Sequence, residues 1–192
     1  MNNSDNILEI FEQTGAMLKG HFLLTSGRHS NVYFQCAKVL QFPKFTELLC
    51  TKIVEYFKDT EIDVVIAPAI GGIVVAQEIG RLLGKKTIFA ERENGSLTLR
   101  RGFSLNEGDR VLVCEDVVTT GGSVFEVIDI VKKANAIVAG VGYIVDRSSG
   151  KVNFGFPQFS TVNVDVISYA PDACPLCKDG KLPAIKPGSR KI

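Results

Sequence analysis

Residues 111–123 read VLVCEDVVTTGGS, and this segment indicates the fold class more strongly than any other. Val111–Cys114 is a short apolar run, typical of a strand that is covered on both faces. The acidic pair Glu115–Asp116 follows it, and Gly121–Gly122 then opens a helix that we expect to continue to about residue 134. A buried strand, a glycine turn and a helix make up the repeating element of a parallel α/β sheet.

The same alternation recurs through the middle of the chain. An apolar run at Val64–Ala67 is followed by a predicted helix from Gly71 to Leu83, which Gly84 ends. Further predicted strands are Thr87–Ala90, Ala136–Val145 and Val162–Ser168, and Glu91–Asp109 is predicted as an exposed loop or hairpin. Strands alternating with helices of this length imply parallel βαβ units. We therefore expect an α/β fold with a doubly wound, mainly parallel sheet flanked by helices.

The N-terminal part follows a different pattern. Its predicted elements are a helix at Asn6–Leu18 ended by Gly20, extended pieces at His21–Thr25 and Val32–Cys36, and a helix from Pro43 to about Lys58 with Phe45, Leu48, Leu49, Ile53 and Phe57 facing inward. No internal repeat or linker is found. We expect a single domain over 1–192, with a small N-terminal hood over about 1–40, a core over about 41–170 and a C-terminal tail at 171–192.

Composition restricts the class of protein. The 192 residues carry a formal net charge of +1, with 45% hydrophobic and 22% charged residues. Interspersed charges of both signs argue against a large nucleic-acid surface. No apolar run approaches the roughly 20 residues that span a bilayer, and the polar, acidic Met1–Glu9 does not resemble a signal peptide. We expect a cytoplasmic protein without membrane or nucleic-acid partners.

The five cysteines do not form a disulfide framework. Cys36, Cys50 and Cys114 lie in apolar contexts, where cysteine acts as a small hydrophobe. Cys174 and Cys177 form a lone CPLC, which supplies only two of the four ligands of a structural zinc site. The pair could bind metal if two subunits each contributed one, or form a disulfide, but incidental thiols are favoured.

The residues after the strand at 111–114 favour a ligand that carries both phosphate and hydroxyl groups. A helix N-terminus offers unpaired N–H groups and a partial positive charge, which suits a phosphate. Gly121–Gly122 lets the backbone approach that phosphate, and the hydroxyls of Thr119, Thr120 and Ser123 add donors. The carboxylates of Glu115–Asp116 fit only if the ligand also presents sugar hydroxyls or Mg²⁺.

This segment closely resembles the phosphoribosyl-pyrophosphate signature of type I phosphoribosyltransferases. The resemblance implies their fold and implies that Glu115 and Asp116 hold the ribose hydroxyls. It also assigns the 5′-phosphate to a loop made up of Val117, Val118, Thr119, Thr120, Gly121, Gly122 and Ser123. Asp116 is expected to be catalytic. The signature does not identify the base.

Three further segments resemble orotate phosphoribosyltransferases, in a bacterial branch with a short arginine-rich loop. The first is LTSGRHS at 24–30, whose SGR-x-S element is followed by Tyr33 and Phe34. The second is Arg147, where the family has an arginine that reaches orotate, and a guanidinium suits a planar anion. The third is AERENGSLTLRRGF at 90–103, together with the tail CPLCKDGKLPAIKPGSR. The resemblance implies orotate contacts from Thr25, Tyr33, Phe34, Thr119 and Arg147.

The sequence departs from the family pattern where lysines are usual. Thr25 replaces a lysine before the SGR element, and the loop after Val64–Ala67 lacks the lysine that many relatives carry. The cations of the shortened loop are Arg92, Arg100 and Arg101. We therefore expect no catalytic lysine and assign pyrophosphate stabilisation to these arginines.

The resemblance also implies a mechanism and an assembly. The base would displace pyrophosphate, assisted by Mg²⁺ that pyrophosphate mainly holds, with Glu115 and Asp116 as possible ligands. The backbone of Ile70, Gly71 and Gly72 would cradle the pyrophosphate, with a non-proline cis peptide in that loop. A mobile loop that serves the neighbouring subunit implies a homodimer.

Two alternatives remain open on the sequence. A purine phosphoribosyltransferase shares the signature but should lack the SGR-x-S element. A regulator that senses phosphoribosyl pyrophosphate would keep the fold, but the chain has no added helix-turn-helix segment and no net basic character.

Overall fold

The computed structural model describes residues 3–24, 26–164 and 167–187, which divide into two compact units. The larger unit is Leu40–Val164, and the smaller unit joins Met1–Val39 to Asp165–Ile192. The segments predicted as hood and tail therefore fall largely into the same unit.

The larger unit contains a six-stranded sheet with the order β5-β4-β3-β6-β7-β8. Its strands are β3 (Val64–Pro68), β4 (Lys86–Glu93), β5 (Ser96–Leu99), β6 (Arg110–Val118), β7 (Ile137–Asp146) and β8 (Gln158–Asn163). Its helices are α3 (Pro43–Tyr56), α4 (Gly71–Leu83) and α5 (Gly122–Lys133). Neighbouring strands are parallel, apart from the antiparallel hairpin of β4 and β5. The predicted doubly wound, mainly parallel sheet is confirmed.

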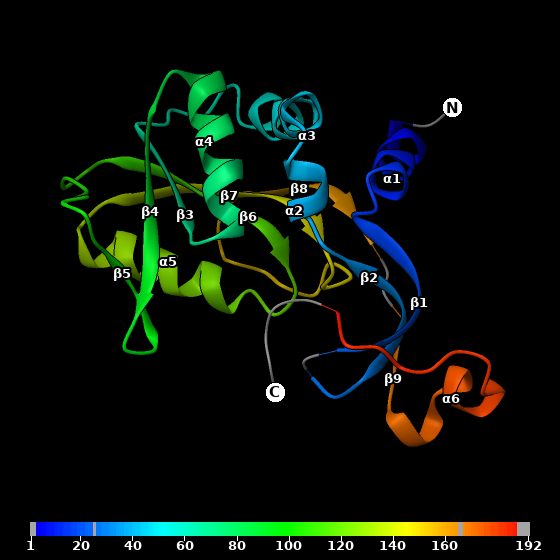
Figure 1. Cartoon of the computed structure of the whole chain (residues 1–192). Coiled ribbons are helices and arrows are strands. Elements are labelled where there is room, and N and C mark those ends of the chain that lie inside the picture. Colours follow the sequence, from blue (N-terminus) through cyan, green and yellow to red (C-terminus); the bar gives the residue numbers. More distant parts are fainter. Residues whose placement is uncertain (1–2, 25, 165–166, 188–192) are drawn as a thin grey trace. The chain divides into compact units, whose positions relative to one another are not determined.

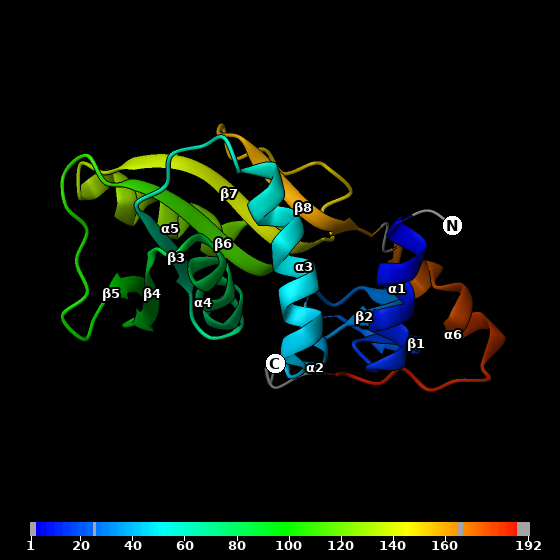
Figure 2. The same ribbon diagram turned by 90° about the horizontal axis from the view of Figure 1, so that it is seen from above.

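Both faces of this sheet are covered, which explains its continuous apolar strands. Val64, Ile66, Val111 and Val113 pack with the buried residues of α5. The alternate residues of these strands are buried on the other face of the sheet. There α4 packs closely on β3, because a Cβ at Gly72 would lie 3.0 Å from the Cβ of Ala67. Figures 1 and 2 show α5 on one side of the sheet, with α3 and α4 on the other.

The order of the strands creates a switch point between β3 and β6. The chain leaves β3 through α4 and returns in β4 on one side, whereas it leaves β6 through α5 and returns in β7 on the other. The carboxyl ends of β3 and β6 therefore lie side by side, with their helices on opposite faces. In open α/β sheets this position holds the ligand.

The smaller unit is built on a three-stranded antiparallel sheet with the order β1-β2-β9. Its elements are α1 (Asn3–Gln13), β1 (Met17–Leu23), β2 (His29–Phe34), β9 (Ser168–Tyr169), the 3₁₀ turn η1 (Pro171–Ala173) and α6 (Pro175–Asp179), while the short α2 (Ala37–Leu40) ends at the first residue of the larger unit. The C-terminal segment returns to this sheet, because Phe22 forms an isolated parallel bridge with Ile185.

The following details of the predicted elements are wrong. The first helix ends at Gln13 rather than Leu18, because Gly15 takes a φ of +66° and the chain then enters β1. Leu48 of α3 faces outward and is 44% exposed. The predicted strand at Val162–Ser168 is the end of β8 and the start of β9, which belong to different sheets.

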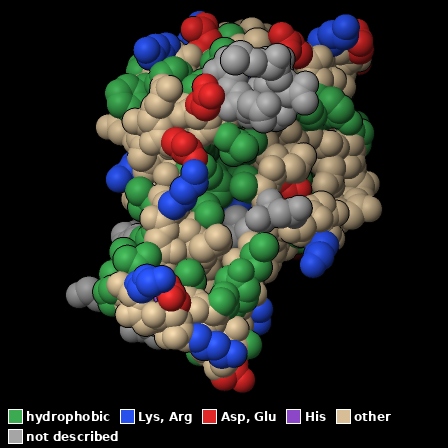
Figure 3. All heavy atoms as spheres, turned by 90° about the vertical axis from the view of Figure 1, so that its right-hand side faces the viewer, with side chains coloured by type: hydrophobic (Ala, Val, Ile, Leu, Met, Phe, Trp, Pro, Cys, Tyr) green, Lys and Arg blue, Asp and Glu red, His purple; other side chains and the backbone are tan. Residues whose placement is uncertain are grey.

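No helix in the described ranges is long and apolar enough to cross a membrane. On the face in Figure 3, basic and acidic side chains are scattered among apolar and uncharged ones, so charges of both signs are mixed over this surface.

Candidate functional site

The acidic pair lies within the last four residues of β6 rather than after the strand. β6 continues to Val118, so Glu115 and Asp116 are strand residues at the switch point. The N–H of Asp116 donates to Oε1 of Glu115 at 3.0 Å, and the N–H of Val117 donates to Oδ1 of Asp116 at 2.9 Å. Both carboxylates are thus held next to the backbone of the strand end.

The first residues of α4 pack directly on these carboxylates. A Cβ at Gly71 would lie 2.6 Å from Cγ of Asp116, and one at Gly72 would lie 3.1 Å from Oε1 of Glu115. Any larger residue at Gly71 would displace the acid, so glycine is required by close approach. Gly71–Gly72 and the acidic pair therefore form one site, although about forty residues separate them in the chain.

The peptide bond between Ala69 and Ile70 is cis, as the resemblance implied. Ile70 precedes α4 and is 82% exposed, and no side chain caps the helix there. Ile70 therefore lies at the surface, whereas Gly72 in the first turn of α4 is buried.

Glu115 is under electrostatic strain within this arrangement. Only 9% of the surface of Glu115 is exposed. Burial raises the pKa of the Glu115 carboxyl well above its ordinary value of 4.5, and the neighbouring charge of Asp116 raises it further. A cation or a hydroxyl group placed beside the pair would relieve this cost, which is what a ribose or a metal-bound ligand supplies.

The N-terminus of α5 forms the second half of the site. Gly121 precedes the helix with a φ of +77°, and no side chain caps the helix start. Thr119 and Thr120 are exposed, and Ser123 is half-buried. Unpaired helix N–H groups with three hydroxyls around them suit an anion such as a phosphate.

Val117 and Val118 connect these two halves. Val118 is buried in the core and Val117 is half-buried, so they fix the strand end while the residues after them turn outward. The N–H of Arg147, which follows β7, donates to the carbonyl of Val118 at 2.8 Å. Arg147 therefore lies at the same edge of the sheet.

The three predicted loop arginines lie on the β4–β5 hairpin and the segment after it, and each is paired with a glutamate. Arg92 contacts Glu126 of α5 at 2.8 Å, Arg101 contacts Glu91 at 2.7 Å, and Arg100 contacts Glu93 at 3.5 Å. The alternation of acids and arginines in AERENGSLTLRR is a local signal for such pairs, but the spacing does not indicate which glutamate each arginine contacts.

The residues of the N-terminal part that were predicted to border a base differ in their burial. Phe34 is buried, with its ring centroid 6.0 Å from that of Phe11. Tyr33 is half-buried beside Phe22, with ring centroids 5.8 Å apart. Thr25 lies outside the described residues.

Comparison with known proteins gives a consistent result. The family model described as "Phosphoribosyl transferase domain" matches residues 38–169. The chain is 58% identical over 188 residues to a protein of Pelotomaculum thermopropionicum named orotate phosphoribosyltransferase, covering 98% of each chain. A solved orotate phosphoribosyltransferase of Aeropyrum pernix matches with a TM-score of 0.71 at 25% identity, over 82% of this chain and 93% of that one.

An adenine phosphoribosyltransferase of Rhodothermus marinus also matches, with a TM-score of 0.65 at 19% identity, over 83% of this chain and 99% of that one. This likeness concerns the fold alone, so the fold does not distinguish between bases.

The raised pKa of Glu115 predicts how its replacement changes stability. Because the folded state holds this proton more tightly, the wild-type chain loses stability as the pH rises above about 4.5, the ordinary pKa, toward the raised one. Glu115→Gln removes that loss. Its free energy of unfolding, measured in urea, should rise relative to wild type as the pH increases above about 5.

Glu126→Gln is the matched control for this measurement. Hydrogen bonds from Arg92 and from the N–H of Leu97 lower the pKa of Glu126, so its replacement should lose stability at pH values above the ordinary pKa. The same pH trend in both variants would contradict the assigned burial of Glu115.

Proposed function

The chain belongs to the phosphoribosyltransferase family, and from this we propose that it is an orotate phosphoribosyltransferase. It transfers the phosphoribosyl group from phosphoribosyl pyrophosphate to orotate, giving orotidine 5′-monophosphate and pyrophosphate in the synthesis of UMP. The observation that carries the phosphoribosyl part is the acidic pair packed on Gly71 beside the uncapped start of α5. The names of full-length relatives support orotate as the base.

Phosphoribosyl pyrophosphate binds along the switch point. The 5′-phosphate occupies the N-terminus of α5, where it accepts hydrogen bonds from backbone N–H groups and from the hydroxyls of Thr119, Thr120 and Ser123. Glu115 and Asp116 accept hydrogen bonds from the ribose hydroxyls. This order places the anomeric carbon of the ribose between the loop at 70–72 and the end of β6.

Pyrophosphate binds at the backbone of Ile70, Gly71 and Gly72. Ile70 is exposed and Gly71 is half-buried, so phosphate oxygens can reach this part of the backbone from solvent, while Asp116 fills the space beside Cα of Gly71. The site also fits Mg²⁺, because carboxylate oxygens are the hard donors that this ion takes, and a cation would relieve the burial cost of Glu115. When bound, Mg²⁺ would screen the charge of the pyrophosphate leaving group.

Following the resemblance to orotate phosphoribosyltransferases, we assign orotate contacts to Arg147, Thr119, Thr25, Tyr33 and Phe34. The backbone bond between Arg147 and Val118 anchors the arginine at the edge where the phosphate loop begins. A guanidinium can form paired hydrogen bonds with a planar carboxylate. Tyr33 is a better candidate for ring contact than Phe34, because Tyr33 is half-buried whereas Phe34 is buried.

The chain contributes orientation and electrostatics rather than a covalent intermediate. A base nitrogen of orotate attacks the anomeric carbon while the bond to pyrophosphate breaks, through a cationic, oxocarbenium-like state. The carboxylate of Asp116 stabilises that positive charge through the ribose, and the phosphate loop fixes the sugar in line with the base.

Arg100 is the leading candidate for the cation that stabilises departing pyrophosphate. Its 3.5 Å ion pair with Glu93 is longer than the pairs of Arg92 and Arg101, and its side chain is 49% exposed. Exposed pairs of this kind contribute little stability, so the guanidinium can exchange partners at small cost.

We propose a single phosphoribosyltransferase domain over 1–192, because the family model matches residues 38–169, which include residues of both units. We further propose a homodimer, in which the arginine-rich hairpin serves the neighbouring site, and a cytoplasmic location, which suits an enzyme of charged small substrates.

The proposed base is tested by an ultraviolet assay of orotate loss, run beside adenine, hypoxanthine and xanthine. We expect orotate consumption that requires both phosphoribosyl pyrophosphate and Mg²⁺. Consumption of a purine instead would overturn the assignment of the base, and no turnover of any base would favour a sensor of phosphoribosyl pyrophosphate.

Asp116→Asn tests the role of the acidic pair. Removing the negative charge beside the ribose should lower kcat by about 100-fold or more without unfolding the chain. Circular dichroism and urea unfolding check the fold. Asp129→Asn, an exposed carboxylate on α5, is the control and should keep its activity. Wild-type turnover by folded Asp116→Asn would refute the assigned role.

Arg100→Ala tests the assignment of the leaving-group cation. We expect kcat to fall by about tenfold or more, because an electrostatic contact to developing charge is lost. Arg81→Ala, which removes an exposed and paired arginine of α4, should leave kcat unchanged. A larger loss for Arg92→Ala or Arg101→Ala than for Arg100→Ala would move the role to that residue.

A further inference from the structure

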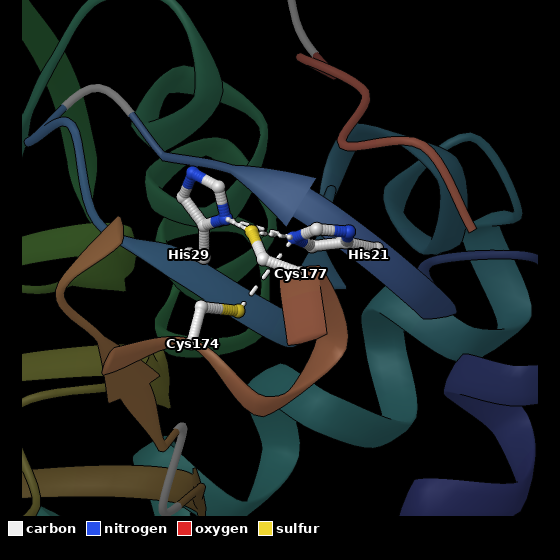
Figure 4. Close-up of side chains that lie close together, drawn as sticks. All are labelled: His21, His29, Cys174 and Cys177. Atoms are coloured by element: carbon white, nitrogen blue, oxygen red, sulfur yellow. Dashed lines mark hydrogen bonds between the residues drawn. The ribbon is translucent and has the colours of Figure 1, made fainter. Parts of the chain in front are cut away.

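The smaller unit brings two histidines and two cysteines together, far from one another in the sequence. One ligand atom from each of His21, His29, Cys174 and Cys177 can be chosen so that all four lie within 4.8 Å of one another. Figure 4 shows the two imidazoles and the two thiols facing a common centre. The function proposed above uses none of these four side chains.

The distances between these atoms are close to the edges of a tetrahedral zinc site. The Sγ atoms of Cys174 and Cys177 lie 3.7 and 3.6 Å from Nε2 of His21, and Sγ of Cys177 lies 3.2 Å from Nδ1 of His29. Tetrahedral Zn²⁺ with ordinary bond lengths separates sulfur from nitrogen by about 3.6 Å. The two nitrogens, 2.7 Å apart, need to separate to about 3.4 Å.

Elements of the smaller unit hold each ligand in place. β1 pairs with β2, and the register of this pairing shifts between Lys19 and Phe22. Because of this shift, the consecutive residues His21 and Phe22 are both buried. Cys174 immediately precedes α6, and Cys177 lies in its first turn, so the spacing of three residues puts both thiols on one side. The ligands thus come from the sheet and from the C-terminal segment that returns to it.

A second contact orients one imidazole as metal sites require. Nδ1 of His21 lies 2.9 Å from the carbonyl of Leu182, and an N–H donated there leaves Nε2 with its lone pair directed at the thiols. Metal-binding histidines usually have such a partner on the second nitrogen. His21 and Cys174 are buried, whereas Cys177 is exposed and leaves a path for the ion.

We propose that His21, His29, Cys174 and Cys177 bind one Zn²⁺ per chain. Two thiolates and two imidazoles select zinc over the hard ions Mg²⁺ and Ca²⁺. Four protein ligands leave no open position, so the ion is structural and fastens the segment around α6 to β1 and β2. Binding exchanges the two thiol protons for the metal, so about two protons are released per zinc.

On the sequence alone, the CPLC pair could bind metal only if two subunits each contributed one. The structure supplies the missing pair from the same chain, in the form of His21 and His29. His29 is also the variable residue of the SGRHS element and begins β2, so the ion would stabilise the strand that carries Tyr33 and Phe34, which the proposed function assigns to orotate. This last consequence rests on the proposed function, but the zinc site does not.

The test measures zinc in the full chain, purified under reducing conditions without a metal-affinity column. Elemental analysis should give about one zinc per chain, and Co²⁺ exchanged into the site should show the thiolate charge-transfer and tetrahedral d–d bands of a Cys₂His₂ site. Chelator in excess should remove the metal and lower the melting temperature.

Cys177→Ala is the diagnostic variant, because its exposed side chain can be removed with little risk to folding. Its zinc content after dialysis should fall at least tenfold, and the Co²⁺ charge-transfer band should weaken. Cys36→Ala, another cysteine of the smaller unit, is the matched control and should keep the ion.

Three outcomes would overturn the proposal. These are a reduced wild-type chain that takes up no zinc even when the ion is supplied, a Cys174–Cys177 disulfide in place of free thiols, and equal zinc loss in both variants. Because these measurements involve no substrate, they succeed or fail independently of orotate turnover.

Discussion

The parallel pairing of β3 with β6 is the constraint on which the site depends. Their register, Val64 with Val111 through Ile66 with Val113, brings the carboxyl ends of both strands to one edge of the sheet. Their helices then leave on opposite faces, which keeps that edge open. Gly71 can therefore lie on the carboxylate of Asp116, and the start of α5 lies next to it. A sheet with another strand order would separate these groups.

Burial of the Glu115 carboxylate at this edge of the sheet costs the folded chain free energy. Glu115 is almost covered, and its pKa is raised because the charged form is poorly solvated and faces Asp116. Such a pair destabilises the fold unless a ligand or cation compensates it. Stored unfavourable electrostatics of this kind is a common property of functional sites, where binding recovers it.

The smaller unit illustrates a different problem of stability. It is assembled from the two ends of the chain and has a modest set of buried apolar side chains. Backbone bonds between Leu23 and Ile185 and between Ile185 and His21 tie its C-terminal segment to β1. A cluster of two imidazoles and two thiols beside these bonds would add a fastening that a small core lacks.

The sequence by itself determined the order of strands and helices in the larger unit. The helix over Gly71–Leu83 with its stop at Gly84 was predicted residue for residue, because glycine geometry is local information. The acidic pair, the glycine turn and the helix start were likewise recognisable, since they are contiguous in VLVCEDVVTTGGS. Local errors occurred where two strands of different sheets, β8 and β9, follow each other without a distinct change in pattern.

Only the tertiary structure decided which distant residues meet. It placed Gly71 on Asp116, paired Arg92 with Glu126, and brought His21 to Cys174. Each contact depends on strand order and on the return of the chain end to β1, and neither is encoded in the spacing of nearby residues. Sequence patterns report local conformation and burial, whereas long-range contacts result from the packing of complete elements.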